Sequence, residues 1–247
     1  MYFHHGKNIL YLLFQVFVLP FVFQSFFIFL FSSIAFCQEE KISDSNLSTK
    51  EKSFSVHPYF NTGTQITVNT ASKEKSAPSP VSFLIGGGAV INFTDFISLE
   101  PKIDFWSMYY LYDGKNALPA EVEHRTATVL CFMLDIPVGF NFHFAENTFS
   151  AGCGLGFLIR LSLLSNGVKQ NDYGATGTAQ SDTDEISKWF WSNARFLYPE
   201  IFIAWDYKIT ASLRAGIVAK AYFCIGSLAD GRGLDGTVIN IAARFIF

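Results

Sequence analysis

Residues Thr148–Ser165 read TFSAGCGLGFLIRLSLLS, and this stretch alternates strictly between two kinds of position. The even positions are mostly small or polar, and they include Arg160. The odd positions up to residue 163 are all apolar: Phe149, Ala151, Cys153, Leu155, Phe157, Ile159, Leu161 and Leu163. Successive side chains of a β-strand point to opposite faces, so a period of two is typical of a strand. The stretch is therefore predicted to be one long strand with an apolar face.

The same alternation recurs in seven further segments of the chain. They are Phe54–Asn69, Val81–Phe93, Phe96–Tyr112, Arg125–Phe144, Trp189–Tyr207, Thr210–Ile225 and Thr237–Phe247. Trp189–Tyr207 is less regular, because its two halves have opposite phases around Pro199, and this predicts a bulge there. Together with Thr148–Ser165 these segments make eight predicted strands.

Short turns and long polar loops alternate between the strands. The predicted turns are Thr94–Asp95, Ala145–Asn147 and Tyr207–Lys208, and the predicted loops are Thr70–Pro80, Asp113–His124, Asn166–Lys188 and Ser227–Gly236. This order indicates an antiparallel up-and-down meander. Each strand is longer than the roughly 9–11 residues that cross the hydrocarbon of a bilayer, and a closed barrel leaves no backbone edge facing lipid. The predicted fold is all-β, an eight-stranded antiparallel up-and-down transmembrane β-barrel over residues 53–247.

The residues before the barrel have a different pattern. No charged residue lies between Ile9 and Phe36, Lys7 precedes this run, and small residues close it, as in a secretory signal peptide. Residues 1–37 are therefore predicted to be a signal peptide, cleaved after Ala35 or Cys37, and residues 38–52 a polar periplasmic linker. A retained membrane anchor is the alternative, because an apolar run of this length can also span a bilayer.

Composition excludes one class of function and leaves a soluble alternative to weigh. The 247 residues are 50% hydrophobic and 16% charged, with a formal charge of −3, so no basic surplus exists to bind nucleic acid. A soluble lipocalin-like barrel also has eight strands. The predicted strands are long for a soluble domain, and the first one lacks the Gly-x-Trp typical of that class. Both features favour the membrane barrel.

Aromatic residues gather at the predicted strand ends, where interfacial anchoring places them. One group lies towards the short turns: Phe93, Phe142, Phe144, Phe149, Trp205, Tyr207, Phe245 and Phe247. The second lies towards the long loops: Tyr109, Tyr112, Trp189, Trp191 and Phe223. Two such belts are expected of a membrane barrel.

The last strand carries a family resemblance. Ile241, Ala243, Phe245 and Phe247 look like the C-terminal signal that the bacterial barrel-assembly machinery reads. With the apolar leader and the eight strands, the chain resembles the small outer-membrane barrels of the OmpX, OmpW and OmpA-transmembrane type. The resemblance implies the outer membrane of a diderm bacterium, periplasmic N- and C-termini, external long loops, and lipid and the assembly machinery as partners.

With the apolar face on lipid, the opposite face would place charges in the lumen. They are Glu100, Lys102, Asp104, Asp135, Arg160, Arg195, Glu200, Asp206, Arg214, Lys220 and Arg244. An eight-stranded barrel is only wide enough for its own side chains, and unpaired buried charges are costly. We therefore expect these residues to pair across the lumen and fill it, with glycines at neighbouring lumen positions making room.

Three functions are compatible with this pattern. The first is a non-enzymatic surface protein whose loops, chiefly Asn166–Lys188, meet an external ligand or host protein in adhesion or defence, or a membrane-structural protein. The second is an OmpW-like conduit for small hydrophobic molecules, which needs an apolar band formed by Leu84, Val90, Trp106, Met108, Met133, Leu158, Val218 and Tyr222. The third is a lipid-modifying enzyme, for which His124 is the candidate catalytic residue.

No motif in the sequence predicts a cofactor or a metal. Gly231–Gly236 matches G-x-G-x-x-G, but too few residues follow it to form a βαβ unit. The four cysteines include no Cys-x-x-Cys pair, which argues against a zinc site, and no disulfide is expected.

Overall fold

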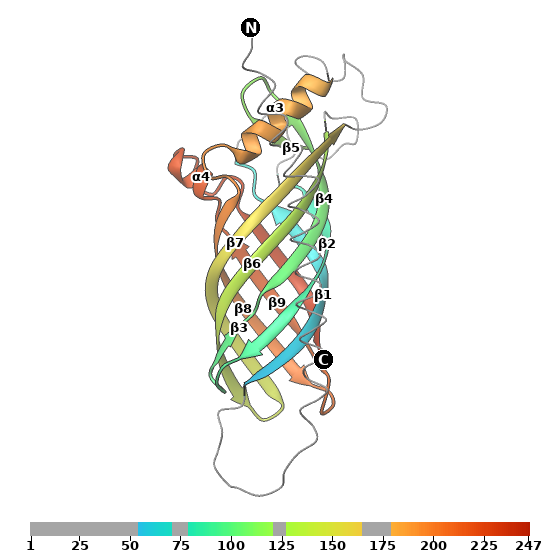
Figure 1. Ribbon diagram of the computed structural model, residues 1–247, viewed down its shortest axis with the longest axis vertical. Coiled ribbons are helices and arrows are strands. Elements are labelled where there is room, and N and C mark those ends of the chain that lie inside the picture. Colours follow the sequence, from blue (N-terminus) through green and yellow to red (C-terminus); the bar gives the residue numbers. More distant parts are fainter. Residues whose placement is uncertain (1–53, 71–78, 121–126, 165–178) are drawn as a thin grey trace, which may run out of the picture. The chain divides into compact units, whose positions relative to one another are not determined.

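The computed structural model describes residues 54–70, 79–120, 127–164 and 179–247 (Figure 1). Every described residue belongs to one compact unit, Lys52–Phe247. The signal peptide and linker predicted within residues 1–52 lie outside the described residues. Neither described helix is long and apolar enough to cross a membrane.

The described residues form ten strands and two helices. The strands are β1 (Ser55–Thr67), β2 (Val81–Asn92), β3 (Ile97–Leu99), β4 (Lys102–Tyr112), β5 (Ala117–Ala120), β6 (Ala127–Phe144), β7 (Asn147–Leu164), β8 (Leu197–Lys208), β9 (Arg214–Tyr222) and β10 (Val238–Ile246). The helices are α3 (Ala179–Trp191) and α4 (Ile225–Ala229).

The strands close into a ring in which every pairing is antiparallel. β1 pairs with β2 on one side and with β10 on the other, and β6 to β10 pair in sequence order. β3 and β4 both lie between β2 and β6, in one unbroken register, and are interrupted only at Glu100 and Pro101. They therefore form one crossing strand, and the barrel has the eight crossing strands that the alternation predicts.

Side-chain exposure gives the two faces of the barrel wall. Along β7 the odd apolar residues point outward, with Phe149, Leu155, Phe157 and Leu163 between 43% and 50% exposed. Arg160, on the other face, is 4% exposed. The outer wall is apolar and the lumen side carries the polar residues, as in a barrel that faces lipid.

The two predicted aromatic belts differ in the structure. All eight residues of the group near the short turns are exposed on the wall. The second group is half-buried, and its Trp189 and Trp191 belong to α3 rather than to a strand end. Only the belt near the turns therefore has the geometry of an exposed interfacial anchor.

Several predicted boundaries are wrong, mostly at the loop end of the barrel. The segment Trp189–Tyr207 is not one strand, because α3 and a turn occupy its first part and β8 begins at Leu197. Pro199 causes no bulge, since the register between β7 and β8 runs through it unbroken. The predicted turn Tyr207–Lys208 is displaced to Ile209–Leu213, where Ile209 N donates to the carbonyl of Leu213.

The predicted long loops also contain regular structure. β5 lies within Asp113–His124 and pairs with β4, and α3 and α4 lie in or beside the two later loops. Figure 1 shows α3, α4 and β5 at the end of the barrel opposite the short turns. Ile186 and Phe190 attach α3 to the barrel, since both are buried in its apolar cluster. Phe190 packs edge-on against Tyr110 with ring centroids 4.9 Å apart.

Candidate functional site

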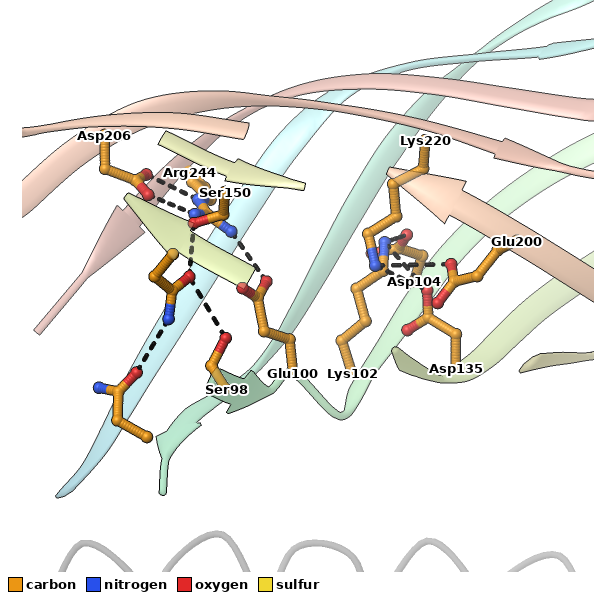
Figure 2. Close-up of polar contacts among 12 residues, drawn as sticks. Ser98, Glu100, Lys102, Asp104, Asp135, Ser150, Glu200, Asp206, Lys220 and Arg244 are labelled. Carbon is orange, nitrogen blue, oxygen red and sulfur yellow. Dashed lines mark hydrogen bonds and ion pairs between the residues drawn. The ribbon is translucent and has the colours of Figure 1, made fainter. Parts of the chain in front are cut away.

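The lumen is the most unusual chemical feature of the described residues, because nine charged side chains are buried in it. Each is at most 4% exposed. They are Glu100, Lys102, Asp104, Asp135, Arg160, Glu200, Asp206, Lys220 and Arg244. Eight of them gather in two clusters, and Arg160 lies apart from both (Figure 2 shows the two clusters).

The arginine cluster consists of Arg244, Asp206 and Glu100. Arg244 Nε donates to Asp206 Oδ1 at 2.6 Å and Nη1 donates to Glu100 Oε2 at 2.9 Å, while Nη2 donates to the other Asp206 oxygen. These residues come from β10, β8 and the break between β3 and β4, none of which pairs with another of the three. The guanidinium therefore links separate parts of the wall through the lumen, with the two-oxygen geometry that strengthens charged hydrogen bonds.

A chain of neutral groups lies beside the arginine cluster. Asn141 Oδ1 accepts hydrogen bonds from Ser150 Oγ at 2.8 Å and from Ser98 Oγ at 3.4 Å. Asn141 Nδ2 donates to Asn92 Oδ1 at 3.5 Å. Hydrogen-bonded amides and hydroxyls therefore accompany the charges on this side of the lumen.

The lysine cluster consists of Lys102, Lys220, Asp104, Asp135 and Glu200. Lys220 Nζ lies 3.0 Å from Asp135 Oδ2 and 3.6 Å from Glu200 Oε2. Lys102 pairs with Asp104, and its Nζ lies 3.8 Å from Asp135 Oδ2. Because β9 and β6 are not neighbours in the ring, the Lys220–Asp135 pair crosses the lumen.

Neutral donors complete the coordination of the lysine cluster. Asn61 Nδ2 and Asn240 Nδ2 donate to the two oxygens of Asp104 at 2.9 and 3.2 Å. Tyr222 Oη donates to Asp135 Oδ2 at 2.5 Å. The two clusters together contain five carboxylates and three cations. The neutral side chains of Asn61, Asn240 and Tyr222 therefore donate hydrogen bonds to carboxylate oxygens that the cations leave unsatisfied. The importance of Asn61 and Asn240 was not predicted, although both occupy polar positions of their strands.

Glycines on neighbouring strands make room for the clustered side chains. A Cβ on Gly86 would lie 2.1 Å from Asp104 Oδ1, and one on Gly216 would lie 2.4 Å from Asp206 Oδ1. Two lumen glycines are therefore needed where a carboxylate of each cluster packs against the neighbouring strand.

Three predicted lumen residues lie outside the clusters. Arg195 is not on a strand but in the turn after α3, where it pairs with Asp230. Arg214 is half-buried at the start of β9, and none of the ion pairs among the described residues involves it. Arg160 is buried on β7 near α3, and its contacts are neutral groups.

The apolar band that a conduit would need packs against itself. Seven of its eight members belong to one buried cluster: Leu84, Trp106, Met108, Met133, Leu158, Val218 and Tyr222. Val90 belongs to a separate small cluster with Tyr59 and Ile246. The residues of the band are therefore buried against one another.

The other predicted site residues have simple placements. On the outer face of β10, Ile241 and Phe245 are 48% and 38% exposed, Ala243 is exposed beside them, and Phe247 is exposed just beyond the strand. His124, the candidate catalytic residue, lies outside the described residues. Among the residues that are described, no group of three or more His, Cys, Asp and Glu side chains is placed to hold a metal ion.

Known structures with a similar course of the chain are small outer-membrane β-barrels. Neisserial surface protein A matches with a TM-score of 0.48 and 7% identity over 79% of this chain and 98% of that one. Ail of Yersinia pestis, in complex with a heparin analogue, matches with a TM-score of 0.40 and 7% identity over 78% and 99%. OprG of Pseudomonas aeruginosa matches with a TM-score of 0.41 and 9% identity over 79% and 97%. No family model and no curated protein matches the sequence.

Proposed function

We propose that the chain is an integral outer-membrane barrel whose lumen is closed and whose loops carry its surface role. The membrane assignment rests on the outer wall. Large apolar side chains such as Phe83, Ile136, Ile203 and Ile217 are between 53% and 67% exposed on different strands. An apolar surface that encircles a monomer is far larger than the patches that soluble proteins expose, and lipid is the environment that matches it.

The observation that carries the closed lumen is the set of ion pairs that cross it. Arg244 joins β10 to β8 and to the β3–β4 break, and Lys220 joins β9 to β6. A continuous aqueous channel would have to run between these groups, and separating a buried pair costs several kcal/mol. Seven residues of the apolar band also pack in one buried cluster, which favours a lumen that stabilises the wall over one that transports solutes.

If the lumen is closed, the loop end is the part of the protein that can contact molecules outside the cell. This end contains α3, α4 and β5, and α3 presents exposed charged side chains including Asp184 and Lys188. A surface role in adhesion or defence, or a membrane-structural role, follows from this arrangement. In this proposal the long loops face outward, the termini are periplasmic, and the assembly machinery recognises the outer face of β10 at Ile241, Ala243, Phe245 and Phe247.

Planar-bilayer recording tests the closed lumen. The full chain, inserted into a lipid bilayer, is expected to give no resolvable single-channel conductance, with a wide porin as positive control. A variant with both Arg244→Ala and Lys220→Ala, which removes the two side chains that cross the lumen, is expected to conduct. Arg214→Ala is the matched control and should stay closed. A regular conductance in the wild type would overturn the proposal and favour the conduit.

Surface proteolysis of intact cells tests the location of the loops. Cleavage is expected only in the four loops opposite the short turns. Cleavage at the Ala145–Glu146 turn in intact cells would contradict the proposed orientation.

A further inference from the structure

Arg160 is a buried cation for which no described residue supplies a counterion. The residue is 4% exposed on β7, and among the described residues no carboxylate forms an ion pair with it. Its Nη2 donates to the backbone carbonyl of Arg195 at 2.5 Å, and its Cζ lies 4.1 Å from the centre of the Phe190 ring. Tyr110 and Tyr198 lie beside it. These neighbours are neutral, so they solvate the guanidinium without balancing its charge.

The guanidinium also has an unused donor, and Arg160 is one of the residues that line a cavity. Arg160 Nε is buried with no hydrogen-bond partner, and so is the indole Nε1 of Trp106. Both residues line one cavity of about 20 Å³ beneath α3, together with Leu158 and Cys131. That volume holds a single particle of about the size of a water molecule. Two unpaired N–H groups on residues around one small cavity call for a hydrogen-bond acceptor.

The one carboxylate residue among those that line this cavity already has partners. Asp235 lines the same cavity, but its Oδ1 accepts the backbone N–H of Thr70 at 2.9 Å, and its Oδ2 lies 3.9 Å from Arg232 Nη1. The other cation nearby, Arg195, is paired with Asp230. The local excess of positive charge therefore belongs to Arg160.

We infer that the cavity beside Arg160 binds a small monovalent anion of halide size, with chloride as the physiological candidate. A water molecule could accept the two N–H donors but would leave the buried charge uncompensated, which is costly. Among monovalent anions, a halide is the nearest in size to the single water-sized particle that about 20 Å³ holds. The site would hold the loop end together, because the Arg160 contacts link α3 and the following turn to the barrel. This inference does not depend on whether the barrel conducts.

Bromide provides the direct test, since it replaces chloride and scatters anomalously. Crystals of the full chain soaked in sodium bromide are expected to show an anomalous peak in the cavity, within hydrogen-bond distance of Arg160 Nε. Crystals of Arg160→Met should lack this peak, and those of Lys188→Gln, which removes an exposed cation of α3, should retain it. An empty cavity in the bromide-soaked wild type would overturn the inference.

Thermal unfolding in detergent micelles separates anion binding from a purely structural role of Arg160. At tenfold excess of bromide over its dissociation constant, the wild type should melt on the order of 4 °C higher than in sodium gluconate of equal ionic strength. Lys188→Gln should keep this difference and Arg160→Met should lose it. If Arg160→Met does not fold, Trp106→Phe keeps the charge, removes one donor, and should reduce the difference. Equal melting temperatures of the wild type in both salts would overturn the inference and leave Arg160 with only a structural role, the attachment of α3 to the barrel.

Discussion

Replacing Arg244 by methionine tests the energetic role of the arginine cluster. The guanidinium is 2% exposed and makes three hydrogen bonds to two buried carboxylates, Asp206 and Glu100. Methionine keeps much of the length of the side chain but has neither charge nor donor. Arg244→Met therefore leaves two carboxylates in the lumen without their cation.

The expected loss follows from the burial of these groups. Removing one partner of a buried ion pair costs roughly 3–5 kcal/mol, because the remaining charge stays desolvated. Glu100 Oε1 already lacks a hydrogen-bond partner, so the loss of Arg244 removes the donor that the Glu100 carboxylate has in this cluster. Burying the methionine side chain recovers only about 1–2 kcal/mol at best. After this recovery, we expect the free energy of unfolding to fall by a net of roughly 2–3 kcal/mol, about half of the cost of the broken ion pair.

Reversible urea unfolding in lipid vesicles, followed by tryptophan fluorescence, measures this loss. Arg214→Met is the control, because Arg214 lies on the same lumen face but forms none of the ion pairs described, and its effect should stay below about 1 kcal/mol. A triple variant, Arg244→Met with Glu100→Gln and Asp206→Asn, removes every charge of the cluster and should recover most of the loss. A loss below about 1 kcal/mol for Arg244→Met, or a triple variant as unstable as the single one, would refute the reasoning.

Three further perturbations have defined outcomes. Gly86→Ala should lower the free energy of unfolding by about 2 kcal/mol, because the new Cβ overlaps Asp104, and unchanged urea unfolding would contradict this close approach. Ile203→Lys, at a wall position that is 65% exposed, should cost roughly 2–4 kcal/mol in lipid vesicles, whereas a cost near zero would mean that this face is in water. The hydrogen bond that Lys188 on α3 donates to the carboxylate of Glu185 raises the pKa of Lys188, so Glu185→Gln should lower that pKa. The stabilisation from this ion pair is present below the ordinary lysine pKa and is lost as pH rises through the raised pKa of Lys188. It stays well under about 1 kcal/mol because Lys188 is exposed. Equal Lys188 pKa values in NMR titrations of the wild type and Glu185→Gln would contradict this effect of Glu185.

The alternation of the sequence predicts the wall well, because a period of two fixes the face on which each side chain lies. Glu100, Asp206 and Arg244 could each be assigned to the lumen from their strands alone. Their pairing could not, because it depends on the stagger of strands far apart in the ring. Arg244 and Glu100 are 144 residues apart in the chain, and no local pattern relates them.

The loop end was predicted poorly because its signals are short and mixed. Helix α3 buries Asp182 and Thr183 beside Ile186 and Phe190, so polar residues interrupt its apolar stripe. The spacing of four between Ile186 and Phe190 was the available sign of a helix. Trp189 and Trp191 instead stand two residues apart, as apolar residues of a strand do, and this spacing places the predicted start of the following strand too early and includes Arg195 in it.

Quenching by brominated lipid tests most directly whether the apolar wall faces lipid around a sealed lumen. Trp205 is 41% exposed on the wall and Trp106 is 1% exposed inside, so two variants that each keep one of these tryptophans report on the two sides. In vesicles of brominated phospholipid the Trp205 variant should be strongly quenched. The Trp106 variant should resist both the lipid and aqueous acrylamide. Quenching of Trp106 by acrylamide, or protection of Trp205 from the brominated chains, would contradict the account.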